Sequence, residues 1–152
     1  MTREILFRGK RIDNGGWING DLITTPFIRN ETQEHITYIL DITKADYDCF
    51  EDLVESNGIF EVDSETVCQY TGLTDKSGRR IFENDVIECK RNNRHFQSQI
   101  EWDSICGGFM FQDTKEGSAV GLDALLNGGI YNDFKIIGNI FDNPEFVKGD
   151  IK

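Results

Sequence analysis

A polar, turn-forming pattern occurs twice in this chain and limits the folds that it can adopt. Each copy starts with an aromatic residue and, two positions later, a glycine. It continues into a polar turn and ends with an acidic residue before an apolar pair. The first copy is Phe7-Arg8-Gly9, Asp13-Asn14-Gly15-Gly16 and Asn19-Gly20-Asp21-Leu22-Ile23, and the second is Tyr70-Thr71-Gly72, Asp75-Lys76-Ser77-Gly78 and Glu83-Asn84-Asp85-Val86-Ile87. Because Asn, Asp and Gly favour turns, the pattern predicts two hairpin-like units, which a partial duplication would explain.

Alternating apolar residues between the turns predict strands. Apolar side chains occupy every second position from Ile36 to Ile42, which is the pattern of a half-buried strand. Further short strand-like runs lie at 5–7, 17–18, 22–23, 59–62, 66–70, 86–90, 96–102, 109–112 and 134–141. Many short strands with turn signals between them are typical of a small barrel or sandwich.

Residues 44–57 have helical periodicity instead. Their apolar side chains share one helical face, namely Tyr47, Phe50, Leu53 and Val54. Thr43 is a candidate N-terminal cap, and Asn57 with Gly58 is a candidate C-terminal cap. We therefore expect one acidic amphipathic helix here, and one or two helical turns within 120–127.

The charge is strongly negative and unevenly distributed. The net charge is −11, and Lys44 is the sole base between Glu31 and Glu65. Such a protein repels phosphate groups, so direct binding of nucleic acid or of an anionic membrane is disfavoured. The acidic stretch is either an ordinary solvated face or a patch that docks a basic partner or imitates the charge of DNA.

No cofactor or metal motif is apparent. Gly72 and Gly78 are too far apart for a phosphate-binding loop, and an arginine pair follows them. Asp46 and Asp48 resemble the start of a calcium loop, but Phe50 occupies the next ligand position. Zinc is not expected because the four cysteines are widely spaced: Cys49, Cys68, Cys89 and Cys106. With no apolar leader and no run near the ~20 apolar residues of a membrane span, we expect a cytoplasmic protein with reduced thiols.

Three residues could carry catalysis, and each has a simpler structural interpretation. Cys106 lies eleven residues from His95 but has no neighbouring cation to lower its pKa, so we expect a core cysteine. Asp21 and Asp85 each precede an apolar pair. We expect them to cap backbone amides in turns rather than to act in acid–base catalysis or bind a metal.

Two tryptophans and a basic cluster could together bind single-stranded nucleic acid. Bases stack on exposed aromatic side chains beside cations, and the cluster comprises Lys90, Arg91 and Arg94. We expect instead that Trp17 and Trp102 pack in the core. The composition of residues 91–94 predicts the turn of a hairpin.

Four blocks of residues, taken in order, resemble one known family. They are Phe7-Arg8-Gly9-Lys10-Arg11 with Trp17-x-x-Gly20-Asp21-Leu22, Glu65-Thr66-Val67-x-Gln69-Tyr70-Thr71-Gly72-Leu73-x-Asp75-Lys76-x-Gly78, Ile81-Phe82-Glu83-x-Asp85-Val86-Ile87, and Ile137-Gly138-Asn139-Ile140-Phe141-Asp142-Asn143-Pro144-Glu145. Together they resemble the YopX-like family of phage and prophage proteins over nearly the whole chain. The sequence departs from the family pattern at Cys68 and Asn84, where glycine is common, and at Ser64, where proline is common.

The resemblance implies a mainly β or α+β protein of phage or prophage origin in a bacterial host cell. It implies an SH3-like barrel in the C-terminal part. We therefore expect an N-terminal β unit with the acidic helix at 1–62 and the SH3-like unit at 63–152. The resemblance supplies no activity and no catalytic, cofactor-binding or metal residues.

The function that these observations favour is a non-catalytic module that binds a protein of the phage or its host. One alternative is an acidic DNA mimic that acts on a nucleic-acid-binding host protein. Another is an uncharacterised enzyme, which would need a deep pocket with converging polar groups. Exposed strand edges would also allow self-association.

Overall fold

The structure is a computed structural model that describes residues 4–28, 35–41, 43, 58–92, 94–113, 118–125 and 131–146. These residues are predominantly β structure, with short 3-10 turns η3 (Ser64–Thr66), η4 (Leu122–Leu125) and η5 (Pro144–Phe146). The prediction of a mainly β protein is confirmed. The predicted helix at 44–57 lies outside the described residues.

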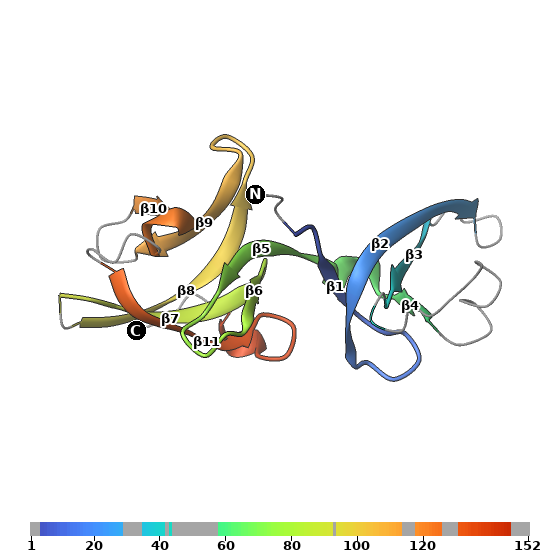
Figure 1. Cartoon of the computed structure of the whole chain (residues 1–152), viewed down its shortest axis with the longest axis horizontal. Helices are drawn as coiled ribbons and strands as arrows, with labels where there is room; N and C mark the ends of the chain where they lie inside the picture. The colour runs from blue at the N-terminus through green and yellow to red at the C-terminus, as the bar shows by residue number, and fades with distance from the viewer. Residues whose placement is uncertain are drawn as a thin grey trace. The chain divides into compact units, whose positions relative to one another are not determined.

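The chain forms two compact units, Met1–Tyr70 and Thr71–Lys152, which can be followed by colour in Figure 1. Strand β5 (Cys68–Thr74) carries the chain from one unit into the other. The sequence-based division at 62/63 falls before η3 and β5. Among the described residues, no helix has the length and apolar character needed to cross a membrane.

The first unit is an antiparallel sheet that curls until its first and fourth strands meet. Its strands are β1 (Phe7–Lys10), β2 (Trp17–Ile28), β3 (His35–Leu40) and β4 (Ile59–Val62), followed by the start of β5. Beyond β1, Arg11 bridges Val62, and the Ile12 N–H donates to the Glu61 carbonyl at 3.0 Å. Closure pairs backbone groups that an open edge would expose. The buried apolar residues of this unit are Leu6, Ile39, Phe60, Val62, Cys68 and Tyr70.

The second unit is a five-stranded antiparallel sheet in the order β10-β9-β8-β7-β11, with β6 paired to β5. Its strands are β6 (Arg80–Phe82), β7 (Asp85–Arg91), β8 (Arg94–Asp103), β9 (Gly108–Asp113), β10 (Ser118–Gly121) and β11 (Tyr131–Asn139). Side chains that alternate along each strand determine which residues enter the core. On β8, Phe96, Ser98 and Ile100 are buried while their neighbours are more exposed. The core cluster comprises Ile81, Ile87, Cys89, Phe96, Ile100, Phe109, Phe111, Leu122 and Leu125.

The two copies of the repeated pattern fold alike only in part. Each begins with a strand and a polar turn. In the first copy, Gly20 and Asp21 then lie inside the continuous strand β2. In the second copy, Asn84 has a φ of +64° and forms a further turn between β6 and β7. The acidic ends of the two copies are therefore not structurally equivalent.

Candidate functional site

The conformation of the turn between β8 and β9 is fixed by the side chain of Asp103. The Asp103 Oδ1 atom accepts hydrogen bonds from the backbone N–H groups of Ile105 at 2.8 Å and Cys106 at 2.9 Å. Gly107 donates its N–H to the Asp103 carbonyl at 2.8 Å and has a φ of +66°, which glycine adopts without steric cost. The local sequence thus fixes this turn, which lies between the strand-like runs predicted at 96–102 and 109–112.

Two large apolar side chains are exposed at this turn. Ile105 is 94% exposed and Trp102 is 46% exposed. The Trp102 ring packs edge-to-face on buried Phe109, with 5.1 Å between the ring centres and 74° between the planes. This contact holds the indole against a buried core residue while leaving much of its surface in solvent.

A hollow of about 270 Å³ lies beside these residues. The strand register pairs Glu101 with Met110 and Gln112 with Ala119. Because side chains alternate across a sheet, these residues face away from the core that Phe109 and Phe111 occupy. The lining residues are Glu101, Trp102, Asp103, Ser104, Ile105, Met110, Gln112 and Ala119.

The chemistry of this lining suits binding better than catalysis. It offers two carboxylates, a thioether, a hydroxyl and an amide, while the Trp102 ring lies on the other face of the sheet with its register partner Phe109. Within this lining there is no histidine, cysteine, lysine or arginine, so a nucleophile with its own base is not assembled there. Across the described part of the chain, no group of three or more His, Cys, Asp or Glu residues is placed to hold a metal ion.

The predicted core positions of Trp102 and Cys106 are wrong. Both residues lie where β8 runs out from the core into the turn, and Cys106 is exposed. His95 lies eight residues before Asp103 on β8, which is about 26 Å along an extended strand. Cys106 therefore cannot pair with His95, and Trp102 lies at the end of β8 opposite to Arg94.

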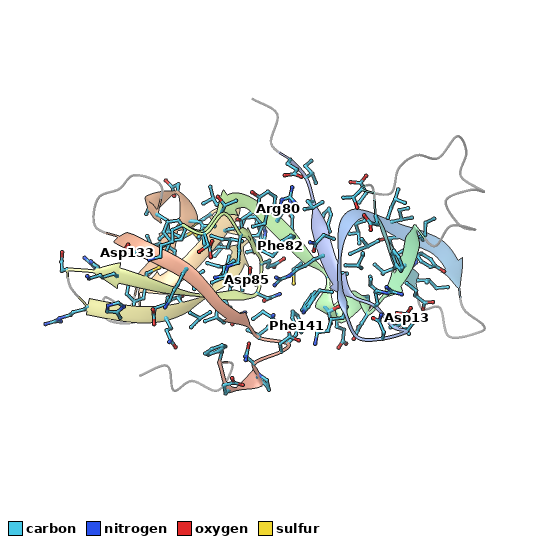
Figure 2. All side chains as sticks on the ribbon, turned by 60° about the horizontal axis from the view of Figure 1, so that its bottom comes forward. Asp13, Arg80, Phe82, Asp85, Asp133 and Phe141 are labelled. Atoms are coloured by element: carbon cyan, nitrogen blue, oxygen red, sulfur yellow. The ribbon has the colours of Figure 1, made fainter. Side chains whose placement is uncertain are left out.

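The two candidate aspartates have different structural roles. Asp85 is buried, and its Oδ2 accepts the Phe82 backbone N–H at 2.8 Å; Figure 2 shows these two side chains close together in the second unit. Asp85 thus caps the turn between β6 and β7. Asp21 lies exposed inside β2, so its predicted turn role is wrong: Gly20 and Asp21 continue the strand.

Trp17 has basic neighbours that the sequence analysis did not assign to it. The Arg8 guanidinium lies 4.6 Å from the centre of the Trp17 ring, and the Lys10 Nζ lies 5.5 Å from it. Both are cation–π distances. Arg8 and Lys10 share one face of β1 because they are two residues apart, and the register sets Lys10 opposite Trp17. Their spacing is the one signal that could have indicated this cluster.

The basic cluster at 90–94 forms the predicted hairpin. Arg91 pairs with Arg94 across β7 and β8, and Asn92 has a φ of +47°. Nearby, the Lys135 Nζ lies 3.0 Å from the Glu88 carboxylate. The hydrogen bond from Lys135 lowers the pKa of Glu88, burial opposes this effect, and the charges of Lys135 and His95 reinforce it.

The C-terminal motif is a network of side-chain caps. The Asn139 Oδ1 accepts the backbone N–H groups of Phe141 and Asp142, both at 3.0 Å. The Asn139 amide donates to the Asp142 carboxylate at 2.8 Å, and the Asn143 N–H donates to the Asn139 carbonyl at 2.9 Å. These residues therefore end β11 and fix the tight turn that follows.

Comparison with known proteins assigns the chain to a family. The profile of the family described as YopX protein matches residues 6–148. The chain belongs to the YopX family. A solved structure, that of protein EF1440 from Enterococcus faecalis, is similar at 18% identity and a TM-score of 0.49, over 97% of this chain and 100% of that one. No curated protein matches the sequence.

The structure accommodates the residues at which this YopX chain departs from the family pattern. Asn84 adopts the left-handed backbone expected of it, with a φ of +64°, and its Oδ1 accepts a hydrogen bond from the Gln99 amide at 2.9 Å. Ser64 opens η3 directly after its cap, Asp63, which is the helical position that proline also favours. Cys68 is buried, and its thiol donates to the Thr66 carbonyl at 3.2 Å.

Proposed function

We propose that this chain is a non-catalytic protein-interaction module that binds a partner protein through the β8–β9 turn and the hollow beside it. The observation that carries this proposal is the exposure of Trp102 and Ile105 on a turn braced by Asp103. Tryptophan is enriched among the residues that dominate interface energies, and rigid apolar anchors lose little entropy on binding. The expected partner surface is an apolar segment.

The negative charge of the site and of the whole chain supports a partner surface that is basic as well as apolar. Glu101 and Asp103 flank the apolar tip, and the whole chain carries a net charge of −11. Such a field attracts cationic surfaces and accelerates their encounter with the site. We therefore propose that the partner presents apolar and basic residues together.

The remaining features of the proposal follow from the family. The chain would act in the cytoplasm of a bacterial host as a phage or prophage product. Its second unit would be an SH3-like barrel, which the sequence of short antiparallel strands around one apolar core supports. The stretch 44–57 would form the acidic helix and add to the negative surface.

A variant-controlled capture experiment tests the proposal. The tagged full-length chain would be incubated with bacterial lysate, and the retained protein would be purified and titrated against each variant. We expect Trp102→Ala to weaken binding by roughly tenfold or more, since interface anchors of this kind often contribute 2 kcal/mol or more. Ile105→Ser should also weaken it. The matched control is Ile12→Ser, which removes an apolar side chain that is 58% exposed in the first unit and should leave binding unchanged.

Other outcomes assign the chain to the alternatives. One such outcome is the capture of a nucleic-acid-binding protein whose binding is unchanged by Trp102→Ala and is lost at high salt. This result would favour the DNA mimic. Retention of a small molecule with no protein would favour an enzyme. Either result overturns the proposed interaction surface.

A further inference from the structure

The tip of the β7–β8 hairpin carries a cluster of basic side chains. Residues 89–100 contain Lys90, Arg91 and Arg94 and no aspartate or glutamate. The two strands run side by side to this tip (Figure 1), where the register pairs Lys90 with His95 and Arg91 with Arg94. A chain with a net charge of −11 therefore has several of its cations concentrated at the end of one hairpin.

The cations project from both faces of the hairpin. On β8, Phe96 is buried in the core. Because side chains alternate across a sheet, His95 and its partner Lys90 lie on the opposite, outer face. Arg94 and its partner Arg91 lie on the same face as Phe96, beyond the end of the core. A ligand that encloses the tip would meet positive charge on either side of it.

Two of these cations are available to a ligand. Neither Lys90 nor Arg94 forms an ion pair or a side-chain hydrogen bond with the described part of the chain. The acid closest to the tip along β7 is Glu88, and the Lys135 Nζ lies 3.0 Å from its carboxylate. The charge of Glu88 is thus offset by Lys135, which leaves the basic side chains at the tip uncompensated on their own strands.

The net negative charge of the chain does not cancel this local cluster. Along β8, the next acid after Arg94 is Glu101, seven residues further on, which is about 24 Å along an extended strand. The Debye length at physiological ionic strength is about 8 Å, so charges at that separation are largely screened from the tip. Repulsion of phosphate is therefore a property of the average surface and does not decide what the hairpin tip binds.

The arrangement of cations suits the major groove of duplex DNA. That groove admits a β ribbon, and phosphates line both of its walls, so cations on two faces can reach both strands. A flat anionic surface such as a membrane would leave one face of cations unused. Residues 90–95 include no Phe, Tyr or Trp, on which the bases of a single strand would stack. Asn92, exposed at the tip with a φ of +47°, adds an amide of the kind that contacts base edges.

We infer that the tip of the β7–β8 hairpin binds double-stranded DNA, with Lys90, Arg91 and Arg94 contacting phosphates on the two walls of the major groove. This is a second interaction surface, at the end of β8 away from Trp102, and it does not rest on the proposed function. Because the main contacts are to phosphates, binding depends little on base sequence and weakens as salt rises.

Salt titrations with a defined duplex test this inference on the full-length chain. The probe is a fluorescein-labelled DNA duplex of mixed sequence, about two helical turns long, and binding is followed by fluorescence anisotropy. Three phosphate contacts predict a slope of about −2.7 for log affinity against log salt, which is a roughly 40-fold loss between 50 and 200 mM NaCl.

Charge variants assign the binding to the hairpin tip. We expect Arg94→Gln to weaken binding at the lower salt by about threefold or more and to make the salt slope shallower by about 1. Lys90→Gln should act alike. The matched control is Arg80→Gln, which removes the same charge from an exposed position on β6 and should change neither quantity. Trp102→Ala should also leave duplex binding unchanged.

Several outcomes would overturn the inference. The first is that the wild type does not bind the duplex at the lower salt, and the second is that Arg94→Gln and Arg80→Gln have equal effects. Tighter binding to a single strand of the same length would exclude the groove. Binding to phosphatidylserine vesicles without binding to the duplex would indicate a membrane, and equal competition by polyglutamate would indicate an acidic protein.

Discussion

At the scale of single residues, Asp75 shows how one buried carboxylate joins distant segments. Its Oδ1 accepts the backbone N–H groups of Ser77 at 2.8 Å and Arg79 at 3.0 Å. Its Oδ2 accepts the Arg79 Nε at 3.0 Å and the Ile136 N–H at 3.2 Å. The Arg79 guanidinium in turn donates to the Ile136 carbonyl at 2.6 Å. The turn between β5 and β6 is thereby fastened to β11.

We expect Asp75→Asn to destabilise the fold by about 2–3 kcal/mol, because an amide group would face donors that need an acceptor. The expected loss of stability is moderate because the Arg79 side chain is 55% exposed and solvent screens its charge. Urea unfolding at pH 7 measures the change. The control is Asp13→Asn, since Asp13 pairs with Arg11 in solvent and its loss should matter much less; equal effects would contradict the assigned role of Asp75.

The same carboxylate predicts a pH dependence. Burial raises the pKa of Asp75, but the hydrogen bonds from Arg79, Ile136 and Ser77 outweigh burial and lower it below 3.8. A lowered folded-state pKa means that the stabilisation is complete above the unfolded pKa of about 3.9 and is lost as pH falls through the folded value. The stability difference between the wild type and Asp75→Asn should therefore be constant near neutral pH and shrink below about pH 4.

At the scale of strands, the sequence predicts where turns occur better than how far strands extend. The 91–94 hairpin and the turn at Gly107 follow from local composition. Gly20 and Asp21 have the composition of a turn, yet β2 runs through them. The cause is nonlocal: a Cβ on Gly20 would lie 2.6 Å from the Leu40 carbonyl carbon on β3. Composition alone cannot distinguish a glycine required by close strand approach from one required by a turn.

Gly20→Ala tests that cause. The added methyl group would collide with backbone, which cannot rotate away, so β2 and β3 must separate. We expect a loss of about 3 kcal/mol or more, measured by urea unfolding, with faster amide exchange in β3. Gly108→Ala is the matched control, since nothing lies within 4 Å of its added Cβ. Unchanged stability in Gly20→Ala would contradict the close approach.

The candidate site could not be predicted from the sequence, because it too depends on nonlocal strand pairing. Its carboxylates, thioether and small residues come from three strands, and only the register of β8, β9 and β10 brings them to one face. Trp102 was expected in the core because large aromatic residues are usually buried. Its position beside the turn, with Asp103 next to it, is the one local signal that favoured exposure.

At the scale of the whole molecule, charge acts on stability and on binding in opposite directions. The chain has 27 acidic and 16 basic residues. Some acids are locally paired, as in Lys135 with Glu88 and Lys76 with Asp133. The unpaired excess repels itself and favours expanded states, yet the same excess attracts a basic partner.

Salt therefore separates the two effects. Raising NaCl from 10 to 300 mM shortens the Debye length from about 30 Å to below 8 Å. We expect the relief of repulsion to raise the melting temperature by roughly 2–4 °C, equivalent to about 1 kcal/mol, while affinity for the captured partner protein falls. KCl should act like NaCl, because screening does not depend on the ion's identity. A falling melting temperature would mean that the local ion pairs outweigh the repulsion. If melting temperature and affinity respond in opposite directions, the loss of binding cannot be attributed to unfolding.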